Sequence, residues 1–256
     1  MQISLAGKSA IVTGAASGIG QATVLQFIEA RAAGVVAVDI APEPGSALRE
    51  CIAREPGRVQ YIRGDVADEA TAQKFTAAAE RAFGRIDILV NNAGISVVKP
   101  VHEHTPEEWD AVMDTNVKAI FLAARQVIPV MIRQKAGVIL NTGSISGQVG
   151  IVTQGAYGPS KGAVHQMTRQ MAIDYAPFGI RVNAIGCGTV DTPIVHKSAA
   201  ASGNPEKFWA MLRDNHPIGR IASPQEVAAF FTYMASDLAS FFTGAILMMD
   251  GGFTAK

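Results

Sequence analysis

The sequence predicts an α/β protein built on a doubly wound parallel sheet of about seven strands, with helices on both faces. Short β-branched runs alternate along the chain with longer segments of helical periodicity, as expected for parallel strands joined by crossover helices. The runs are also apolar almost throughout, which is typical of strands that are covered on both faces. The expected strands are residues 9–14, 34–40, 59–65, 86–92, 137–143, 180–186 and 245–250.

The first strand leads into a glycine-rich turn, Gly14-Ala15-Ala16-Ser17-Gly18-Ile19-Gly20, where the first helix begins. Glycines allow the backbone to approach a pyrophosphate, and a helix N-terminus offers free N–H groups and the positive end of its dipole. A tight turn without a ligand is the alternative. The position directly after the first apolar strand favours a dinucleotide site.

Asp39 ends the second strand, 19 residues after Gly20. A carboxylate there can accept hydrogen bonds from both ribose hydroxyls of adenosine, and it would repel a 2′-phosphate. Neither the glycine turn nor the residues immediately after Asp39 include an arginine or a lysine. An ordinary aspartate at a strand end is the alternative; we expect NAD as the cofactor, in preference to NADP.

Several later helices have recognisable ends. Asp68 is expected to cap a helix over 69–83 that stops at Gly84, and Thr105 and Ser223 each open a capping box with proline at the first helical position. No repeat or linker divides the chain, so we expect 1–256 to form one domain. The segment at about 190–222 has weak strand and helix patterns, and we interpret it as a long loop that forms a substrate lid.

Composition limits the classes of function. Basic and acidic residues balance at 22 each, so neither a nucleic-acid partner nor an anionic membrane surface is indicated. Cys51 and Cys187 are too few for a disulfide framework and fit a reducing compartment. We expect no apolar run long enough to cross a bilayer, and therefore a cytoplasmic protein. His102 and His104 resemble a metal pair but lack a third ligand, so we expect solvated side chains and no metal site.

Tyr157 and Lys161 lie four residues apart, so on a helix they would share one face. A phenol beside an ammonium can exchange a proton near neutral pH, although such pairs also arise by chance. Ser144 closes the fifth apolar strand, thirteen residues before Tyr157. The carboxyl ends of parallel strands line one crevice, so Ser144 should face the same space as the glycine turn.

Taken in order, these motifs resemble the short-chain dehydrogenase/reductase family. The resemblance extends from near residue 7 to the C-terminal DGGFTA, and it rests on Thr13-Gly14-x-x-x-Gly18-x-Gly20, Asn91-Asn92-Ala93-Gly94, Asn116, Ser144 and Tyr157-x-x-x-Lys161. It implies a Rossmann-like fold and an oxidoreductase in which a nicotinamide cofactor carries the hydride.

The resemblance also implies residue roles. Tyr157 would be the general acid/base, and Lys161 together with the oxidised nicotinamide would lower the phenol's pKa from its usual value of about 10. Ser144 would hold the substrate oxygen, and Asn116 would bend its helix and hold a water that relays protons to Lys161. The implied catalytic residues are Asn116, Ser144, Tyr157 and Lys161. The implied cofactor-binding residues are Gly14, Ser17, Gly18, Ile19, Gly20, Asp39, Asp65, Val66, Asn92, Tyr157, Lys161, Val190 and Thr192, and the substrate-binding residues are Ser144, Gln154 and Tyr157. Of the cofactor-binding residues, Asp65 and Val66 would meet the adenine, Asn92 would pass close to the adenosine ribose, and Val190 and Thr192 would hold the carboxamide.

The sequence departs from the family pattern at Cys187, where proline is usual. The loop could be looser with a thiol near the nicotinamide, or the cysteine could be packed and inert. Gly143 stands where a serine often precedes the catalytic one, and we expect little consequence. His196 and His216, at the two ends of the lid, are expected on the surface. An apolar lid face and plain helix packing are both open for Phe208, Trp209, Met211 and Leu212.

We therefore predict an NAD-dependent dehydrogenase of a secondary alcohol, with a sugar, a polyol and a cyclic alcohol as candidates. Amides at Gln148 and Gln154 would suit a hydroxylated substrate such as a sugar or polyol. A 3-oxoacyl-type ketone reductase and a non-catalytic NAD-binding sensor are the alternatives. The helices near 106–135 and 157–177 are rich in apolar and small residues. The resemblance implies that subunits pair through these two helices and that the C-terminal segment forms another contact, so we expect a homotetramer. The residues assigned to its helical interface are Phe121, Val127, Val130, Met131, Gly162, Ala163, Met167 and Met171.

Overall fold

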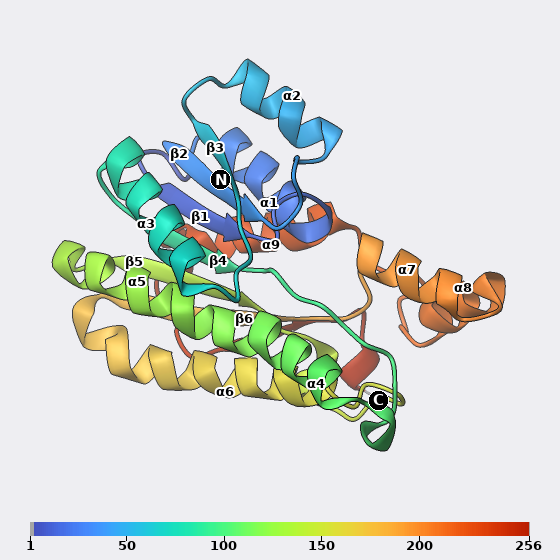
Figure 1. Ribbon diagram of the computed structural model, residues 1–256. Helices are drawn as coiled ribbons and strands as arrows, with labels where there is room; N and C mark the ends of the chain where they lie inside the picture. Colours follow the sequence, from blue (N-terminus) through green and yellow to red (C-terminus); the bar gives the residue numbers. More distant parts are fainter. Residues whose placement is uncertain (1–2, 256) are drawn as a thin grey trace.

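The computed structural model describes residues 3–255 and contains one parallel sheet of seven strands in the order β3-β2-β1-β4-β5-β6-β7 (Figure 1). The expected strands are confirmed, each boundary within two residues of its prediction. They are β1 (Ser9–Thr13), β2 (Gly34–Asp39), β3 (Val59–Arg63), β4 (Ile88–Asn91), β5 (Gly137–Thr142), β6 (Ile180–Cys187) and β7 (Ile246–Met249). The strand order reverses between β1 and β4, where Val12 pairs with Val90, and this reversal opens a crevice at the carboxyl ends of the strands.

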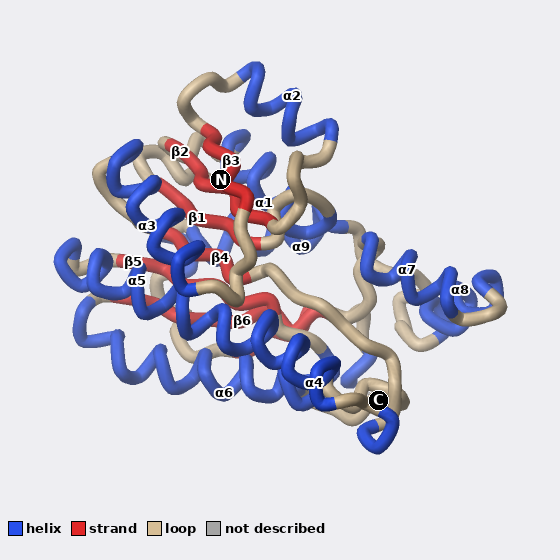
Figure 2. The backbone as a smooth tube through the Cα atoms, in the orientation of Figure 1, coloured by secondary structure: helices blue, strands red, loops and turns tan. Residues whose placement is uncertain are grey.

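Helices cover both faces of the sheet (Figure 2). Their bounds are α1 (Gly18–Glu29), α2 (Ser46–Arg54), α3 (Glu69–Phe83), α4 (Pro106–Met113), α5 (Ala119–Gln134), α6 (Tyr157–Tyr175), α7 (Pro193–Ala201), α8 (Pro205–Asp214) and α9 (Pro224–Ala235). One apolar cluster lies under α1, α2 and α9 and contains Phe27 and Phe231. The other lies under α3, α5 and α6 and contains Phe75 and Met131. Burying each such side chain contributes about 1.5–3 kcal/mol.

The helix ends follow the predicted signals with one exception. Thr105 Oγ1 accepts from Glu108 N at 3.2 Å while Glu108 Oε2 accepts from Thr105 N at 3.1 Å, and Ser223 and Glu226 form the same capping box. Gly84 ends α3 in the left-handed region with φ 71°. Asp68 occupies the N-cap position, but its side chain makes no capping hydrogen bond.

One helical stretch, Pro106–Gln134, is by length and composition able to span a membrane, contrary to the expectation from the sequence. It comprises α4, a π-helical turn at Asp114–Lys118 and α5. The inward face of α5 packs into the core, where Val127 and Met131 are fully buried. A core helix meets the same criteria, so the length of this stretch does not assign it to a membrane.

The lid differs most from prediction. The segment expected as a loop over 190–222 contains α7 and α8, which stand away from the sheet (Figure 1). Pro193 occupies the first turn of α7, and Asn204 Oδ1 caps α8 by accepting from Lys207 N at 3.0 Å. None of the residues of α8 is buried. The two helices have only nine and ten residues, fewer than the window of about 11–18 residues over which a helical period is recognised in a sequence.

The assembly prediction rested partly on core residues. Val127, Val130, Met131 and Met171 are at most 8% exposed within this one chain, so they are committed to its own core. Phe121 is 51% exposed and remains available for a contact.

Candidate functional site

The glycine turn between β1 and α1 requires its glycines. Gly14 and Gly18 have φ of +66° and +53°, and a Cβ on Gly20 would lie 2.0 Å from the carbonyl oxygen of Gly14. A Cβ on Gly14 would lie 2.8 Å from Cα of Ala93, in the loop after β4. The backbone of the turn therefore packs against itself and against the loop after β4, and a side chain on Gly14 or Gly20 does not fit.

The start of α1 suits an anion. Ser17 occupies the N-cap position without a side-chain capping bond, and the first turn has no acidic residue. The positive end of the helix dipole is therefore not neutralised locally. The predicted phosphate-binding residues, including Gly18 and Ile19, lie at this helix start.

Asp39 lies beside the same turn. Its Oδ2 accepts from Ala16 N at 2.9 Å, and its Oδ1 accepts from Ala41 N at 2.9 Å. A carboxylate has about four acceptor positions, so two remain for hydroxyl groups. A glycine turn, an unneutralised helix start and a carboxylate together form a donor and acceptor set that fits a nicotinamide dinucleotide.

The residues predicted near adenosine surround the turn. Asn92 Nδ2 donates to the carbonyls of Thr13 and Gly14 at 3.0 and 3.2 Å, and Asn92 Oδ1 accepts from Thr142 Oγ1 at 3.1 Å. Its side chain thus braces the turn against β5. Val66 lines a small cavity that also includes Thr13 and Ala93. Asp65 Oδ1 accepts from Ala67 N at 2.9 Å, which shapes the loop after β3.

The loop after β6 reaches the turn from the opposite side. Val190 forms an isolated parallel bridge with Ala222, and Thr192 is the N-cap residue of α7. A Cβ on Gly18 would lie 3.2 Å from Thr192 Cγ2. The residues predicted to hold the carboxamide therefore meet the predicted phosphate turn.

Tyr157, Lys161 and Ser144 come together at the end of β5. Lys161 Nζ lies 5.5 Å from the centroid of the Tyr157 ring and donates to the carbonyl of Thr142 at 2.7 Å. The Ser144 hydroxyl hydrogen-bonds the Tyr157 side chain and also accepts from Ser146 N at 3.1 Å. The predicted helical face of Tyr157 and Lys161 is the one turned to the site.

Asn116 lies in the π-helical turn, so the helix is distorted where the bend was predicted. Such turns are frequent at functional sites. Asn116 Oδ1 accepts from Ile95 N at 2.9 Å, and its Nδ2 donates to Ile95 O and to Ser160 Oγ, both at 3.0 Å. A Cβ on Gly94 would lie 3.2 Å from Asn116 Oδ1 and 3.8 Å from Lys161 Nζ. The absence of a side chain there keeps Asn116 and Lys161 close to the same stretch of backbone.

Burial dominates the titration of the pair. Burial raises the pKa of Tyr157 to about 12, against the opposing effect of the Ser144 hydrogen bond. Burial lowers the pKa of Lys161 to about 8. A lowered pKa of Tyr157, as expected from the sequence, is not a property of the protein without its cofactor.

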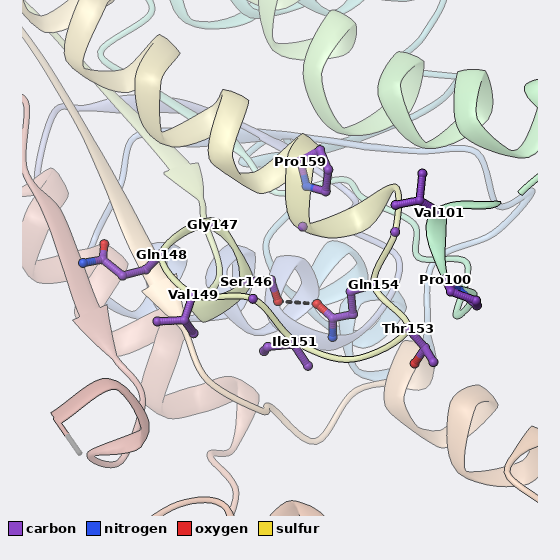
Figure 3. Close-up of a pocket in the computed structure, with 13 residues that line it drawn as sticks. Pro100, Val101, Ser146, Gly147, Gln148, Val149, Ile151, Thr153, Gln154 and Pro159 are labelled. Atoms are coloured by element: carbon purple, nitrogen blue, oxygen red, sulfur yellow. Dashed lines mark hydrogen bonds between the residues drawn. The ribbon is translucent and has the colours of Figure 1, made fainter. Parts of the chain in front are cut away.

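A pocket of about 440 Å³ lies beside this group (Figure 3). Gln154 points to Ser146, and its Oε1 accepts a hydrogen bond from the Ser146 hydroxyl (Figure 3). The side chain of Gln148 is turned away from Ser146 (Figure 3). Ser144, Tyr157 and Lys161 do not line this pocket. They adjoin it through Ser146, whose hydroxyl accepts from Ser144 Oγ at 3.1 Å. The lining residues are Pro100, Val101, Ser146, Gly147, Gln148, Val149, Gly150, Ile151, Thr153, Gln154, Gly155, Gly158 and Pro159.

Two histidines predicted at the surface are buried. The His104 side chain is 2% exposed, with neither ring nitrogen hydrogen-bonded in the described structure, and His216 is 3% exposed. His196 is exposed as predicted, and its Nε2 lies 2.6 Å from Asp191 Oδ1. Among residues 3–255, no group of three or more histidine, cysteine or acidic side chains could hold a metal ion.

Cys187 ends β6 and is 5% exposed, and burial raises the pKa of its thiol to about 12. These properties favour the packed, inert cysteine. In the lid, the Trp209 ring lies 5.0 Å from the His196 ring in an edge-on contact. Because α8 contributes no buried residue, packing into the core does not explain its apolar side chains.

Sequence reasoning did not identify His165. It is 2% exposed on α6, one turn beyond Lys161, and its Nε2 accepts from Ser144 N at 3.5 Å. Burial, together with Arg169 and Lys161, lowers the pKa of His165 to about 4, so the ring is neutral at ordinary pH. The spacing of four residues from Lys161 was the available signal.

Known proteins resemble the chain along nearly its whole length. A family model described as enoyl-(acyl carrier protein) reductase matches residues 14–254. The chain is 40% identical to cis-4-hydroxycyclohexanecarboxylate dehydrogenase of Sinomonas cyclohexanicum over 97% of each chain. It is 38% identical to cyclopentanol dehydrogenase of Comamonas sp. over 97% of this chain and 98% of the relative. It is likewise 38% identical to 3-oxoacyl-[acyl-carrier-protein] reductase of Thermotoga maritima, over 97% and 98%.

A solved structure, levodione reductase, superposes with a TM-score of 0.93 at 32% identity and covers 98% of this chain and 99% of its own. The seven-stranded parallel sheet with helices on both faces agrees with these similarities. The chain belongs to the short-chain dehydrogenase/reductase family of oxidoreductases.

Proposed function

We propose that the protein is an NAD-dependent dehydrogenase that interconverts an uncharged cyclic secondary alcohol and its ketone by hydride transfer. The observation that carries the proposal is the meeting of Ser144, Tyr157 and Lys161 at the end of β5, next to a glycine turn flanked by Asp39. A phenol, a hydroxyl and an ammonium at one point are the groups that move a proton to or from a substrate oxygen.

The residues divide the work as follows. When bound, NAD supplies the carbon that accepts the hydride. Tyr157 removes the hydroxyl proton of the alcohol, and Ser144 donates a hydrogen bond to the same oxygen. Lys161 stabilises the phenolate by its charge, and it also binds the nicotinamide ribose. Asn116, held by Ile95 and Ser160, positions a water that returns protons to Lys161.

NAD preference is assigned to Asp39. Two of its acceptor positions are used by Ala16 N and Ala41 N, and the remaining two suit the adenosine ribose hydroxyls. The negative charge beside the glycine turn would repel a 2′-phosphate.

The substrate class follows from the pocket and the relatives. None of the described residues that line the pocket is charged, and Gln154 and Ser146 supply amide and hydroxyl groups. Lys99, which adjoins it, is engaged by Glu108 at 2.6 Å. Two of the compared dehydrogenases are named for alcohols of five- and six-membered rings. The relatives support a ring alcohol, although one of them is named for a carboxylate anion. The uncharged pocket lining favours a neutral ring alcohol.

The test is oxidation of a panel with NAD and with NADP, followed by absorbance of the reduced cofactor. The panel holds cyclopentanol, cyclohexanol, cis-4-hydroxycyclohexanecarboxylate, a hexose, a polyol and, in the reverse direction, a 3-oxoacyl thioester. Turnover of a ring alcohol with NAD is expected. Turnover of the thioester alone, with NADPH, would assign the ketone reductase. NAD binding without any turnover would assign the non-catalytic sensor.

We also propose that residues 1–256 form one domain, that four such chains assemble into a homotetramer, and that the protein is cytoplasmic. Phe121 on α5 and Ile173 on α6 are 51% and 75% exposed, and they give the two helices apolar surface that an interface would cover. Light scattering at micromolar concentration should give four chains; a monomer would refute the assembly.

A further inference from the structure

Two buried histidines hold the two loops that flank Tyr157 and Lys161. We propose that His165 and His216 are positioning residues that work as neutral imidazoles, His165 for the loop of Ser144 and His216 for the loop of Val190 and Thr192. The inference rests on the proposed function, because it concerns how that site is kept in place.

His165 fits between two glycines of the loop after β5. Its Nε2 accepts from Ser144 N at 3.5 Å, and the ring also hydrogen-bonds the backbone of Gly147. A Cβ on Gly143 would lie 2.6 Å from Nε2, and a Cβ on Gly147 would lie 2.6 Å from Cε1. The imidazole therefore occupies the space that these glycines leave, and it fixes the backbone that carries the Ser144 hydroxyl.

His216 makes the equivalent contacts at the loop after β6. Its Nε2 accepts from Thr189 N at 3.1 Å, and its Nδ1 lies 2.7 Å from the carbonyl of Leu212 in α8. A Cβ on Gly188 would lie 2.8 Å from Nε2, and the Phe253 ring packs 5.5 Å away. One ring thus ties the end of the lid and the C-terminal segment to the loop predicted to hold the carboxamide.

The protonation state follows from the partners. A carbonyl oxygen can only accept, so Nδ1 of His216 must carry a hydrogen; a backbone N–H can only donate, so Nε2 must not. The same reasoning applies to His165, between the amide of Ser144 and the backbone of Gly147. Each ring must be the neutral Nδ1–H tautomer, and a cation would place two donors face to face.

Matched substitutions separate positioning from stability. Phenylalanine keeps a ring but removes the acceptor, whereas glutamine provides an oxygen near the position of Nε2. His216→Phe should raise the Kd of NAD about tenfold, measured by titration without alcohol, and leave kcat at saturating NAD within about threefold. His165→Phe should lower kcat about tenfold and leave the Kd of NAD within about threefold. The glutamine variants should recover part of each loss.

Phe231→Leu, in the core under α9, is the control for lost stability, because Phe231 is fully buried and outside the site. A control with an equal fall in Tm should keep both constants within about threefold of the wild type. If both phenylalanine variants change Kd and kcat alike, or glutamine recovers nothing in a folded protein, the positioning roles are refuted.

The ¹⁵N chemical shifts of the two rings provide a readout that does not need activity. The neutral Nδ1–H tautomer is expected for His165 and His216 at pH 7 in the protein alone. A charged ring or the Nε2–H tautomer at either position would refute the inference there. Failure of every alcohol in the panel would instead remove the proposed function and leave the tautomers and the NAD titration to be judged separately.

Discussion

Removing the charge of Lys161 should shift the pH dependence of alcohol oxidation. The charge lies 5.5 Å from the centre of the Tyr157 ring. At an effective dielectric constant of about 20, a unit charge at that distance stabilises a phenolate by about 3 kcal/mol. That energy corresponds to about a hundredfold in the fraction of phenolate at any pH at which Lys161 is charged, that is, below about 8.

Lys161→Met removes the charge and keeps most of the aliphatic stem. Since oxidation requires the phenolate, kcat at pH 7 and saturating NAD should fall about a hundredfold, and the rise of rate with pH should move to higher pH. The measurement is kcat between pH 6 and pH 11 at saturating NAD, because Lys161 also serves the ribose. Lys161→Arg keeps the charge and is the matched control for its removal.

Whether the pH dependence of kcat shifts in Lys161→Met decides between an electrostatic and a geometric role of the lysine. If Lys161→Met lowers kcat equally at all pH values, the lysine acts on binding geometry and its charge does not act on the phenol. If kcat of Lys161→Met stays within about threefold of wild type at pH 7, the electrostatic reasoning is refuted.

Three further substitutions and one titration test the rest of the site. Tyr157→Phe removes only the hydroxyl, so NAD binding should persist while turnover falls by at least about a hundredfold; a folded variant that keeps more than about a tenth of wild-type turnover would refute the acid/base role. Asp39→Ala should raise the Km for NAD and lower that for NADP, and a wild type that already uses both equally would remove the basis for this. Gly20→Ala would place a Cβ 2.0 Å from the carbonyl of Gly14, so NAD binding should be lost with the turn; unchanged affinity in a calorimetric titration would contradict the packing. The pKa of His165 is about 4 in the folded protein, so the unfolded chain protonates this ring at a higher pH than the folded chain does. The free energy of unfolding should therefore fall as the pH drops from about 6.5 to about 4, and His165 should contribute at most about 1.4 kcal/mol per pH unit. Denaturant titrations of wild type and His165→Asn should differ in this pH slope and agree in it above pH 7.

The fold could be predicted from the sequence because its signals are local. The seven strands follow from apolar runs, and the capping boxes at Thr105 and Ser223 follow from four consecutive residues each. The lid helices were missed for a physical reason. Pro193 and the pair Asn204-Pro205 did mark their starts, but nine and ten residues are too few for a helical period to be recognised over the usual window of about 11–18.

The burial of single histidines could not be predicted in the same way. His216 is buried because Thr189, Leu212 and Phe253 surround its ring, and two of these three lie far from it in the chain. His104 is enclosed without a hydrogen-bonding partner, which nothing in its neighbouring sequence indicates. Such environments are set by tertiary contacts, whereas the Tyr157–Lys161 spacing is a property of one helix.

The proton chemistry of the site depends on how far Tyr157 and Lys161 are buried, which the sequence alone does not give. Burial opposes charge on both partners, raising the pKa of Tyr157 to about 12 and lowering that of Lys161 to about 8. The phenol therefore keeps its proton until positive charge is brought close to it, and the oxidised nicotinamide is such a charge. Lys161, by contrast, can release and regain a proton near its working pH. Thr142 O occupies only one of the three donors of its ammonium. Lys161 Nζ also lies near Gly94, beside the backbone that Asn116 holds. Under the proposed function, the lysine is therefore placed to exchange with solvent the proton that Tyr157 takes from the alcohol.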